Sequence, residues 1–127
     1  MSKIIVDTSR APAAIGPYSQ AVKVNNMVFL SGQIPLVPDS MEIVRGGFEE
    51  QAHQVFKNLR AVAQEAGSSL ADSVKLTVYV TDLDNFASLN DIMQMYFSEP
   101  YPARAAVQVA ALPKAALIEI DAVLCLD

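Results

Sequence analysis

Apolar residues along this chain form short strand-like runs that alternate with longer stretches of helical period. Short apolar runs at residues 4–6, 18–24, 27–34 and 74–80, and two more within residues 100–127, are typical of β-strands. Two longer stretches instead repeat an apolar residue every three to four positions, as one face of a helix does. The predicted order is strand, hairpin, helix, strand, helix, strand, strand.

Turn residues separate these segments. Residues 7–17 contain glycine and prolines and are predicted to form a loop. The pair Asn25-Asn26 predicts a tight hairpin turn, because asparagine tolerates a positive φ. A Leu-Pro-Lys turn at residues 112–114 joins the last two strands.

The first helix is predicted to begin near Phe48 and to stop at Gly67. Its apolar stripe consists of Phe48, Ala52, Val55, Phe56, Leu59, Val62, Ala63 and Ala66. The second helix is predicted to be capped by Asp84 and stopped by Pro100 and Pro102. Its stripe consists of Phe86, Leu89, Ile92, Met93, Tyr96 and Phe97, which we interpret as ordinary core.

These elements predict the α+β class, with two helices on one face of a mixed sheet. Alternation along the strands assigns to the helix-covered face Val28, Leu30, Val74, Leu76, Val78, Val80, Ile118, Ile120, Ala122, Leu124 and Leu126. It assigns to the other face Met27, Phe29, Ser31, Lys75, Thr77, Tyr79, Arg104, Ala106, Gln108, Glu119, Asp121, Val123 and Cys125. That second face is too apolar to be left to water alone, so we expect a homo-oligomer.

Composition narrows the class of protein. A chain of 127 residues with 52% hydrophobic and 18% charged residues predicts one compact domain over residues 1–127. The net charge of -5 disfavours nucleic acid as a partner, because binding to phosphates depends on Lys and Arg. A single cysteine cannot close an intrachain disulfide, and no signal sequence or long apolar span is present. We therefore expect a cytoplasmic protein that does not contact membranes.

Charged residues within the last two strands are the first candidates for chemistry, because burying a charge needs a partner or a ligand. Arg104 can hold a small carboxylate through two hydrogen bonds, or form a structural salt bridge to Glu119 or Asp121. Glu119 can orient water or transfer a proton, or merely pair with Arg104. Asp121 is either a proton relay or one partner of an ion pair at a subunit interface.

Other polar residues carry weaker signals. The hydroxyls of Tyr18 and Ser31 can bind a ligand or cap nearby backbone, and Asn90 can be a ligand contact or a solvated helix position. His53 lies on the polar stripe of the first helix, so we expect a solvated surface role for it. One histidine and one cysteine do not supply a zinc site, and no phosphate-binding glycine loop or Ser-His-Asp system is indicated.

Several motifs together resemble one family over nearly the whole chain. They are residues 15–21 (IGPYSQA), 30–35 (LSGQIP), Asn58-Leu59, residues 78–83 (VYVTDL), Asn90, residues 102–104 (PAR) and residues 118–120 (IEI). In this combination and order the chain resembles the Rid/YjgF family of reactive intermediate deaminases, and within it the RidA-type enamine/imine deaminases.

The resemblance implies a chorismate-mutase-like fold and a homotrimer with clefts between subunits. It implies hydrolysis of small 2-imino acids, such as 2-iminobutanoate and 2-iminopropanoate, to 2-keto acids and ammonia, with no metal or organic cofactor. By position, Arg104 binds the substrate carboxylate and Glu119 orients or activates water. Tyr18, Ser31 and Asn90 line the cleft, together with backbone groups near Gly32 and Ala106.

The sequence departs from the family in two places. Ala106 stands where the family commonly has cysteine or valine, which excludes a thiol-dependent role at that position. The segment between Phe97 and Pro102 is shorter than in many relatives and is expected to change the cleft mouth. A trimer that binds small carboxylates without turnover is the alternative function, and a nuclease activity is disfavoured by the acidic charge.

Overall fold

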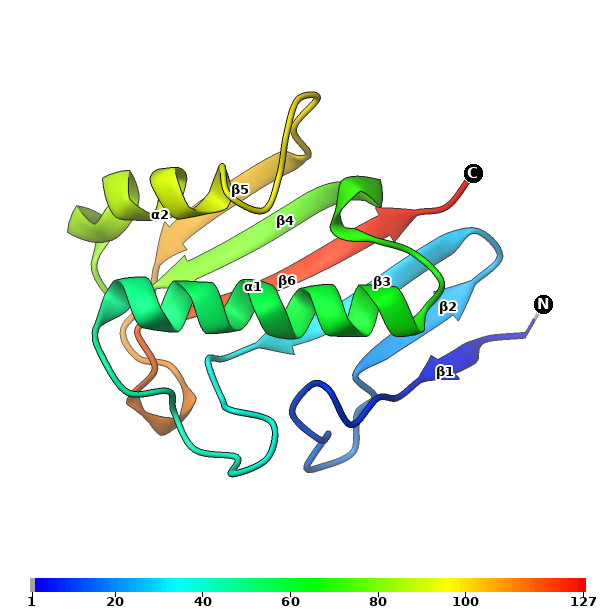
Figure 1. Cartoon of the computed structure of the whole chain (residues 1–127), viewed down its shortest axis with the longest axis horizontal. Coiled ribbons are helices and arrows are strands. Elements are labelled where there is room, and N and C mark those ends of the chain that lie inside the picture. Colours follow the sequence, from blue (N-terminus) through cyan, green and yellow to red (C-terminus); the bar gives the residue numbers. More distant parts are fainter. Residues whose placement is uncertain (1) are drawn as a thin grey trace.

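The computed structural model describes residues 2–127 and forms two layers, a six-stranded sheet and two helices (Figure 1). The strands are β1 (Ile4–Val6), β2 (Ala21–Val24), β3 (Met27–Gln33), β4 (Ser73–Val80), β5 (Ala103–Gln108) and β6 (Ile118–Cys125). The helices are α1 (Phe48–Glu65) and α2 (Phe86–Met93), with short 3₁₀ turns at Leu70–Asp72, Leu83–Asn85 and Pro113–Ala115. The predicted order of elements and the α+β class are confirmed.

The sheet is mixed, with the strand order β1-β2-β3-β6-β4-β5. Every neighbouring pair is antiparallel except β4 and β5, which are parallel. Both helices lie on one face of this sheet: α1 crosses its middle, and α2 lies beside α1 toward the β4–β5 end (Figure 1). The β2–β3 hairpin turns at Asn25, whose φ is +53°.

The core lies between α1 and the sheet, as the apolar periodicity predicts. Every residue of the predicted α1 stripe is buried, and α1 ends before Gly67, whose φ of +80° suits a glycine. Burying a large apolar side chain stabilises the fold by about 1.5–3 kcal/mol. The largest fully buried side chains include Phe56 and Leu59 of α1, Leu89 of α2 and Ile118 and Ile120 of β6.

The ends of α2 differ from the prediction. Asp82, rather than Asp84, provides the cap: its carboxylate accepts a hydrogen bond from the backbone N–H of Asp84 at 2.9 Å and begins the 3₁₀ turn before α2. The helix ends at Met93, well before Pro100, and the chain continues through turns. Prolines mark where a helix cannot continue, not where it must end.

A β-bulge corrects the predicted face of Val74. The pairing of β4 with β6 shifts register between Ser73 and Lys75, so Val74 turns outward and is 44% exposed while Ser73 is buried. A bulge inserts one extra residue into a strand, so residues before it point to the side opposite to the one that strict alternation predicts. The remaining inward residues of β4 are buried as predicted.

The face of β5 is the most important correction. In the parallel pairing, Arg104 lies beside Leu76, Ala106 beside Val78 and Gln108 beside Val80. Laterally paired residues point to the same side of a sheet, and Leu76 and Val78 are buried under the helices. Arg104, Ala106 and Gln108 therefore lie on the helix-covered face, not on the open face that alternation assigned to them.

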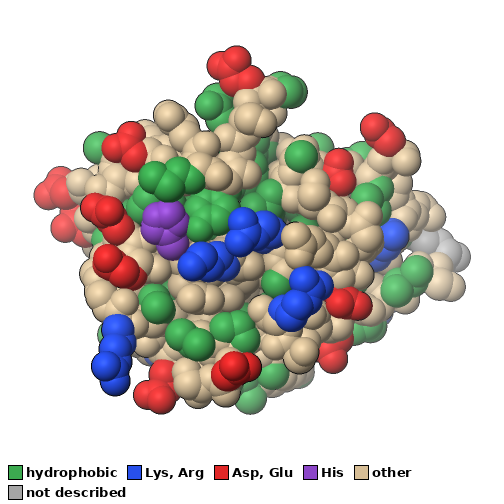
Figure 2. Space-filling model, in the orientation of Figure 1, with side chains coloured by type: hydrophobic (Ala, Val, Ile, Leu, Met, Phe, Trp, Pro, Cys, Tyr) green, Lys and Arg blue, Asp and Glu red, His purple; other side chains and the backbone are tan. Residues whose placement is uncertain are grey.

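His53 is not simply a solvated residue. It is half-buried, and its Nδ1 lies 2.8 Å from the hydroxyl of Tyr96, which itself stacks on Phe56. The guanidinium of Arg60 lies over the same tyrosine ring at 5.5 Å. This cluster joins α1 to the turn after α2. Figure 2 shows the side of the molecule that the helices cover, with Lys and Arg side chains gathered near its middle and acidic ones toward the rim.

Both helices of the described chain lie on one face of the sheet, and neither covers the opposite, open face (Figure 1). It carries Phe29, which is 49% exposed, and the half-buried Tyr79, Asp121 and Val123. The prediction of a mixed apolar and polar open face is confirmed for these strands. Neither helix of the described chain is long and apolar enough to cross a membrane.

The turn before β6 is expected to gain stability from Ala115→Gly. Ala115 has a φ of +57°, in the left-handed region. That conformation costs a side-chain-bearing residue roughly 1–2 kcal/mol, and glycine's extra freedom in the unfolded chain offsets about half of the relief. We expect the free energy of unfolding in urea to rise by roughly 0.5–1 kcal/mol. Ala116→Gly, at a φ of −63°, should instead lose stability, and equal effects would contradict the argument.

Candidate functional site

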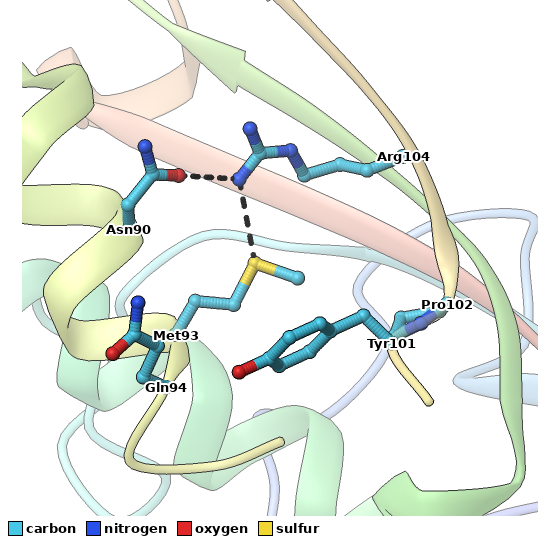
Figure 3. A pocket seen from close by; sticks show the side chains of 6 residues that line it. All are labelled: Asn90, Met93, Gln94, Tyr101, Pro102 and Arg104. Carbon is cyan, nitrogen blue, oxygen red and sulfur yellow. Dashed lines mark hydrogen bonds between the residues drawn. The ribbon is translucent and has the colours of Figure 1, made fainter. Parts of the chain in front are cut away.

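Arg104 lies at the edge of the sheet, where α2 covers the start of β5 (Figure 3). Its Nη1 donates a hydrogen bond of 2.7 Å to Oδ1 of Asn90 and contacts Sδ of Met93 at 3.6 Å. The guanidinium also lies over the ring of Phe86, 4.9 Å from its centroid. These three residues of α2 are spaced by four and three positions, so they share one helix face. The helix thus fixes the plane of the guanidinium.

The remaining edge of the guanidinium is free to bind a ligand. Neither Nε nor Nη2 of Arg104 donates a hydrogen bond to a group of residues 2–127, and the ion pair formed within this part of the chain is Arg10–Glu65. The salt bridge from Arg104 to Glu119 or Asp121 is therefore not formed within one chain. A free pair of parallel N–H groups matches the geometry of a carboxylate.

A cavity of about 300 Å³ opens beside Arg104. It is lined by Asn90, Met93, Gln94, Tyr101, Pro102 and Arg104, from the end of α2 and the segment entering β5 (Figure 3). We call it the arginine pocket. Arg104 is the one charged side chain in this lining, so the pocket suits a small anion.

A second cavity of about 310 Å³ contains Glu119. We call it the glutamate pocket; its lining consists of Pro12, Ala13, Ile15, Tyr18, Gln20, Gly32, Gln33, Ile34, Leu36, Pro113, Lys114 and Glu119. The loop before β2, the end of β3 and the turn before β6 meet here. The pocket combines an acidic group with apolar walls.

The Glu119 carboxyl lies directly against the backbone of Gly32. A Cβ at position 32 would come within 2.2 Å of Oε2, so only glycine leaves room for this approach. Burial raises the pKa of Glu119 above its usual value, and the nearby Asp121 charge raises it further. A carboxyl with a raised pKa is better suited to exchange protons near neutral pH.

Two buried amides hold the walls of the glutamate pocket. Gln20 accepts a 2.7 Å hydrogen bond from the Thr8 N–H and donates to the carbonyls of Thr8 and Pro12, which fixes the loop before β2. Asn58 of α1 donates to the carbonyl of Leu36 at 2.9 Å. Both residues belong to the motifs that carry the family resemblance, and their contacts are structural.

The other candidate residues fall into three groups. Tyr18 lines the glutamate pocket, although its hydroxyl also accepts a hydrogen bond from the Ile15 N–H at 3.3 Å. Ser31 lies in neither lining and donates its hydroxyl to the Ser19 carbonyl. Ala106 packs against the core, and Asp121 accepts a 3.1 Å hydrogen bond from Tyr79. The structure thus brings Asn90 to Arg104, and Tyr18 and Gly32 to Glu119.

The two pockets open on different sides of the sheet. Arg104 lies beside Leu76 on the helix-covered face, whereas Glu119 lies beside Tyr79 on the open face. Sequence reasoning placed both side chains on one face and missed the contacts of Phe86, Met93, Gln94 and Tyr101. The spacing of Phe86, Asn90 and Met93 was a usable signal, because it predicts one helix face.

A family model described as endoribonuclease L-PSP matches residues 8–125. A RutC family protein of Pyrococcus abyssi is 50% identical over 123 residues, which cover 97% of each chain. A human protein named 2-iminobutanoate/2-iminopropanoate deaminase is 47% identical over 119 residues, covering 94% of this chain and 87% of its own. These likenesses extend over nearly all of both sequences.

Solved structures give the same result. RidA from an Antarctic Psychrobacter has a TM-score of 0.94 and 54% identity, covering 97% of this chain and 99% of its own. TdcF of E. coli, solved with bound serine, has a TM-score of 0.93 and 43% identity, covering 98% and 99%. At this identity the likeness extends to the family as well as to the fold.

Proposed function

The chain belongs to the family described as endoribonuclease L-PSP, the YjgF/Rid family, and we propose that it hydrolyses small 2-imino acids to 2-keto acids and ammonia. The substrates would include 2-iminobutanoate and 2-iminopropanoate, the compounds in the name of the human relative. The observation that carries the proposal is the guanidinium of Arg104, which is fixed by Asn90 at 2.7 Å and whose Nε and Nη2 donate no hydrogen bond within residues 2–127. This edge of the guanidinium would bind the substrate carboxylate.

The chemistry needs only a positioned water and one proton carrier. Water adds to C2 of the imine, and Glu119 takes one of its protons and delivers it to the nitrogen as the C=N double bond becomes single. Glu119 then takes the proton of the new hydroxyl and delivers it to the amino nitrogen, so that the C–N bond breaks, ammonia leaves and the carbonyl forms. Proximity and general acid–base catalysis supply the acceleration.

Arg104 and Glu119 would act on one substrate across a subunit boundary. Their positions on opposite faces of the sheet support this, since the two side chains of one chain do not share a pocket. The open face, with the exposed Phe29, supports a partner surface there. The proposed assembly is a homotrimer with the arginine pocket of each subunit against the glutamate pocket of the next.

Mixed oligomers test this arrangement. Chains carrying Arg104→Ala and chains carrying Glu119→Gln should each be inactive alone, but refolding them together should restore about a quarter of the wild-type sites, because mixed oligomers contain boundaries with both native residues. Keto-acid release and light scattering would be measured on the same samples. A monomer, or no recovery of activity in verified mixed oligomers, would contradict a shared site.

The activity itself is tested with a threonine dehydratase, which releases an imino acid from threonine. The wild-type protein should accelerate keto-acid formation above the spontaneous hydrolysis that the dehydratase alone allows. No acceleration at any protein concentration would contradict the proposed function.

Binding without turnover is the second candidate, because TdcF of E. coli was solved with bound serine, an amino acid. In that case calorimetry would detect keto-acid binding that needs Arg104, and the coupled assay would show no acceleration. RNA cleavage, which the family description names, fits poorly with a net charge of -5 and with one cation in the arginine pocket.

A further inference from the structure

The glutamate pocket contains a positive charge that the hydrolysis described above does not use. Its lining holds two charged side chains, the acidic Glu119 and the basic Lys114, and its other residues are neutral. Lys114 is exposed and lies in the short 3₁₀ turn Pro113–Ala115, which leads into β6. A ligand that enters this cavity therefore meets both charges.

Lys114 connects the turn before β6 to the loop between β3 and α1. Its Nζ donates a hydrogen bond of 3.2 Å to the backbone carbonyl of Met41 in that loop, and Figure 1 shows the two segments side by side. The first residues of the same loop, Ile34 and Leu36, line the glutamate pocket. The hydrogen bond therefore holds the ammonium at the edge of the pocket. We call it the rim cation.

The backbone that carries the rim cation is constrained. The φ angles of Lys114 and Ala115 are +56° and +57°, in the left-handed region, which glycine or asparagine adopts at less cost than lysine does. The turn is nevertheless fixed, because the backbone N–H of Leu117 donates to Oε1 of the buried Gln51 of α1 at 2.8 Å. Unfavourable backbone that is kept beside a pocket is a reason to look for a function of the side chain.

A negatively charged ligand meets an unfavourable field at this protein. The net charge of the chain is -5, and Glu119, which must be ionised to accept a proton, adds a negative charge inside the pocket. Arg104 attracts a carboxylate, but it lines the other pocket, across the proposed subunit boundary. A sphere with the 310 Å³ volume of the glutamate pocket is about 8 Å across, which is about the Debye length at physiological salt. The charge of Lys114 therefore acts throughout the cavity.

We propose that Lys114 attracts the carboxylate of the ligand into the shared site and so strengthens its binding to Arg104, without contacting the reacting atoms. This inference rests on the proposed function, because it takes the glutamate pocket of one subunit to face the arginine pocket of the next. The ammonium acts through its field, so its effect should be that of an exposed charge and should decrease with salt.

Calorimetry with 2-oxobutanoate tests the rim cation on the assembled protein, because a stable keto acid binds without turnover. At about 0.1 M salt, Lys114→Gln should raise the Kd by about 1.5- to 5-fold, the usual effect of one exposed charge. Lys114→Glu should raise it by about 2- to 25-fold, because the change in charge is doubled. At about 1 M salt the Debye length is about 3 Å, and both Kd values should approach that of the wild type in the same salt.

Two further variants serve as controls. Lys114→Arg keeps the charge and should keep the Kd within about twofold of the wild type. Lys57→Glu makes the same change in net charge as Lys114→Glu, but on an exposed position of α1 outside both pocket linings, and its Kd should also stay within about twofold. Lys114→Gln provides the answer if Lys114→Glu does not fold, because its neutral amide can still donate to the carbonyl of Met41.

The outcomes separate this inference from the proposed function. If Lys114→Gln and Lys114→Glu weaken binding equally, or if the loss persists at high salt, the effect is structural and the rim cation is overturned. An equal loss in Lys57→Glu would overturn it too, since only net charge would then matter. If the wild-type protein binds 2-oxobutanoate but does not accelerate the coupled dehydratase assay, the proposed function fails and the same variants still decide the role of Lys114. No binding by the wild-type protein would overturn the rim cation whatever the assay shows.

Discussion

Arg104→Ala should reduce kcat/KM for a 2-imino acid by about 30- to 4,000-fold, which corresponds to the loss of one partner of a desolvated charge pair, roughly 2–5 kcal/mol. The reason is that the free edge of the guanidinium is the anchor of the substrate carboxylate. Arg104→Lys keeps the charge, but an ammonium cannot give a carboxylate two parallel hydrogen bonds while also donating to Asn90, and the variant should still lose at least about tenfold.

The measurement is keto-acid release in the coupled dehydratase assay, at several substrate concentrations. Arg60→Ala is the control: Arg60 is an exposed arginine of α1 that lines neither pocket, and its loss should leave kcat/KM within twofold, roughly the scatter of a neutral surface change. Full activity in a folded Arg104→Ala protein would contradict the role of Arg104 as the anchor of the substrate carboxylate.

Glu119→Gln should lower kcat by roughly 10²- to 10⁴-fold, the usual contribution of a general acid–base group. The amide has nearly the same shape, so it can keep its place against Gly32 while losing the ability to take up a proton. Binding of a keto acid at Arg104 should change little, because the carboxylate anchor is intact. Calorimetry measures the binding, and the coupled assay measures the rate.

The pH dependence gives an independent check on Glu119. The base must be ionised to accept a proton, and burial raises the pKa of this carboxyl, with a further increase from Asp121. As the pH falls through the raised pKa, the ionised fraction and therefore kcat should fall, beginning at a higher pH than for an exposed glutamate. Asp121→Asn removes a neighbouring charge, lowers that pKa and should move the fall to lower pH.

Glu119→Gln should lose this pH-dependent step altogether. If the variant kept the wild-type rate, or if its residual rate kept the same acidic fall, another group would be the proton carrier. These two results together distinguish a catalytic Glu119 from one that only shapes the pocket.

Much of the fold could be predicted because local chemistry decides it. The three- to four-residue period from Phe48 to Ala66 predicted the buried face of α1, and Gly67 marked its end. Asn25 predicted the β2–β3 turn because asparagine tolerates the positive φ that this turn requires. Asp84 failed as a cap because Asp82 begins a 3₁₀ turn that no apolar periodicity reveals.

The candidate site could be predicted only in part. The motifs singled out Asn90 and Arg104, which line one pocket, and Tyr18, Gly32 and Glu119, which line the other, but they did not show that there are two pockets. They did not indicate Gln94 and Tyr101, because residues that line a cavity from a helix end and a loop carry no periodic signal. Nor did they show that Gln20 and Asn58 serve as buried anchors of the backbone.

By itself, the sequence determined the elements, the α+β class and the family, because periodicity, turn residues and motif order are properties of neighbouring residues. Only the tertiary structure decided where Arg104 points. Alternation in the strand Ala103–Gln108 separates Arg104 and Gln108 from three apolar residues and so predicts an open face for Arg104, but the parallel register with Leu76 places the guanidinium under α2. Which face a residue occupies depends on pairing with a distant strand, and that pairing separates Arg104 from Glu119.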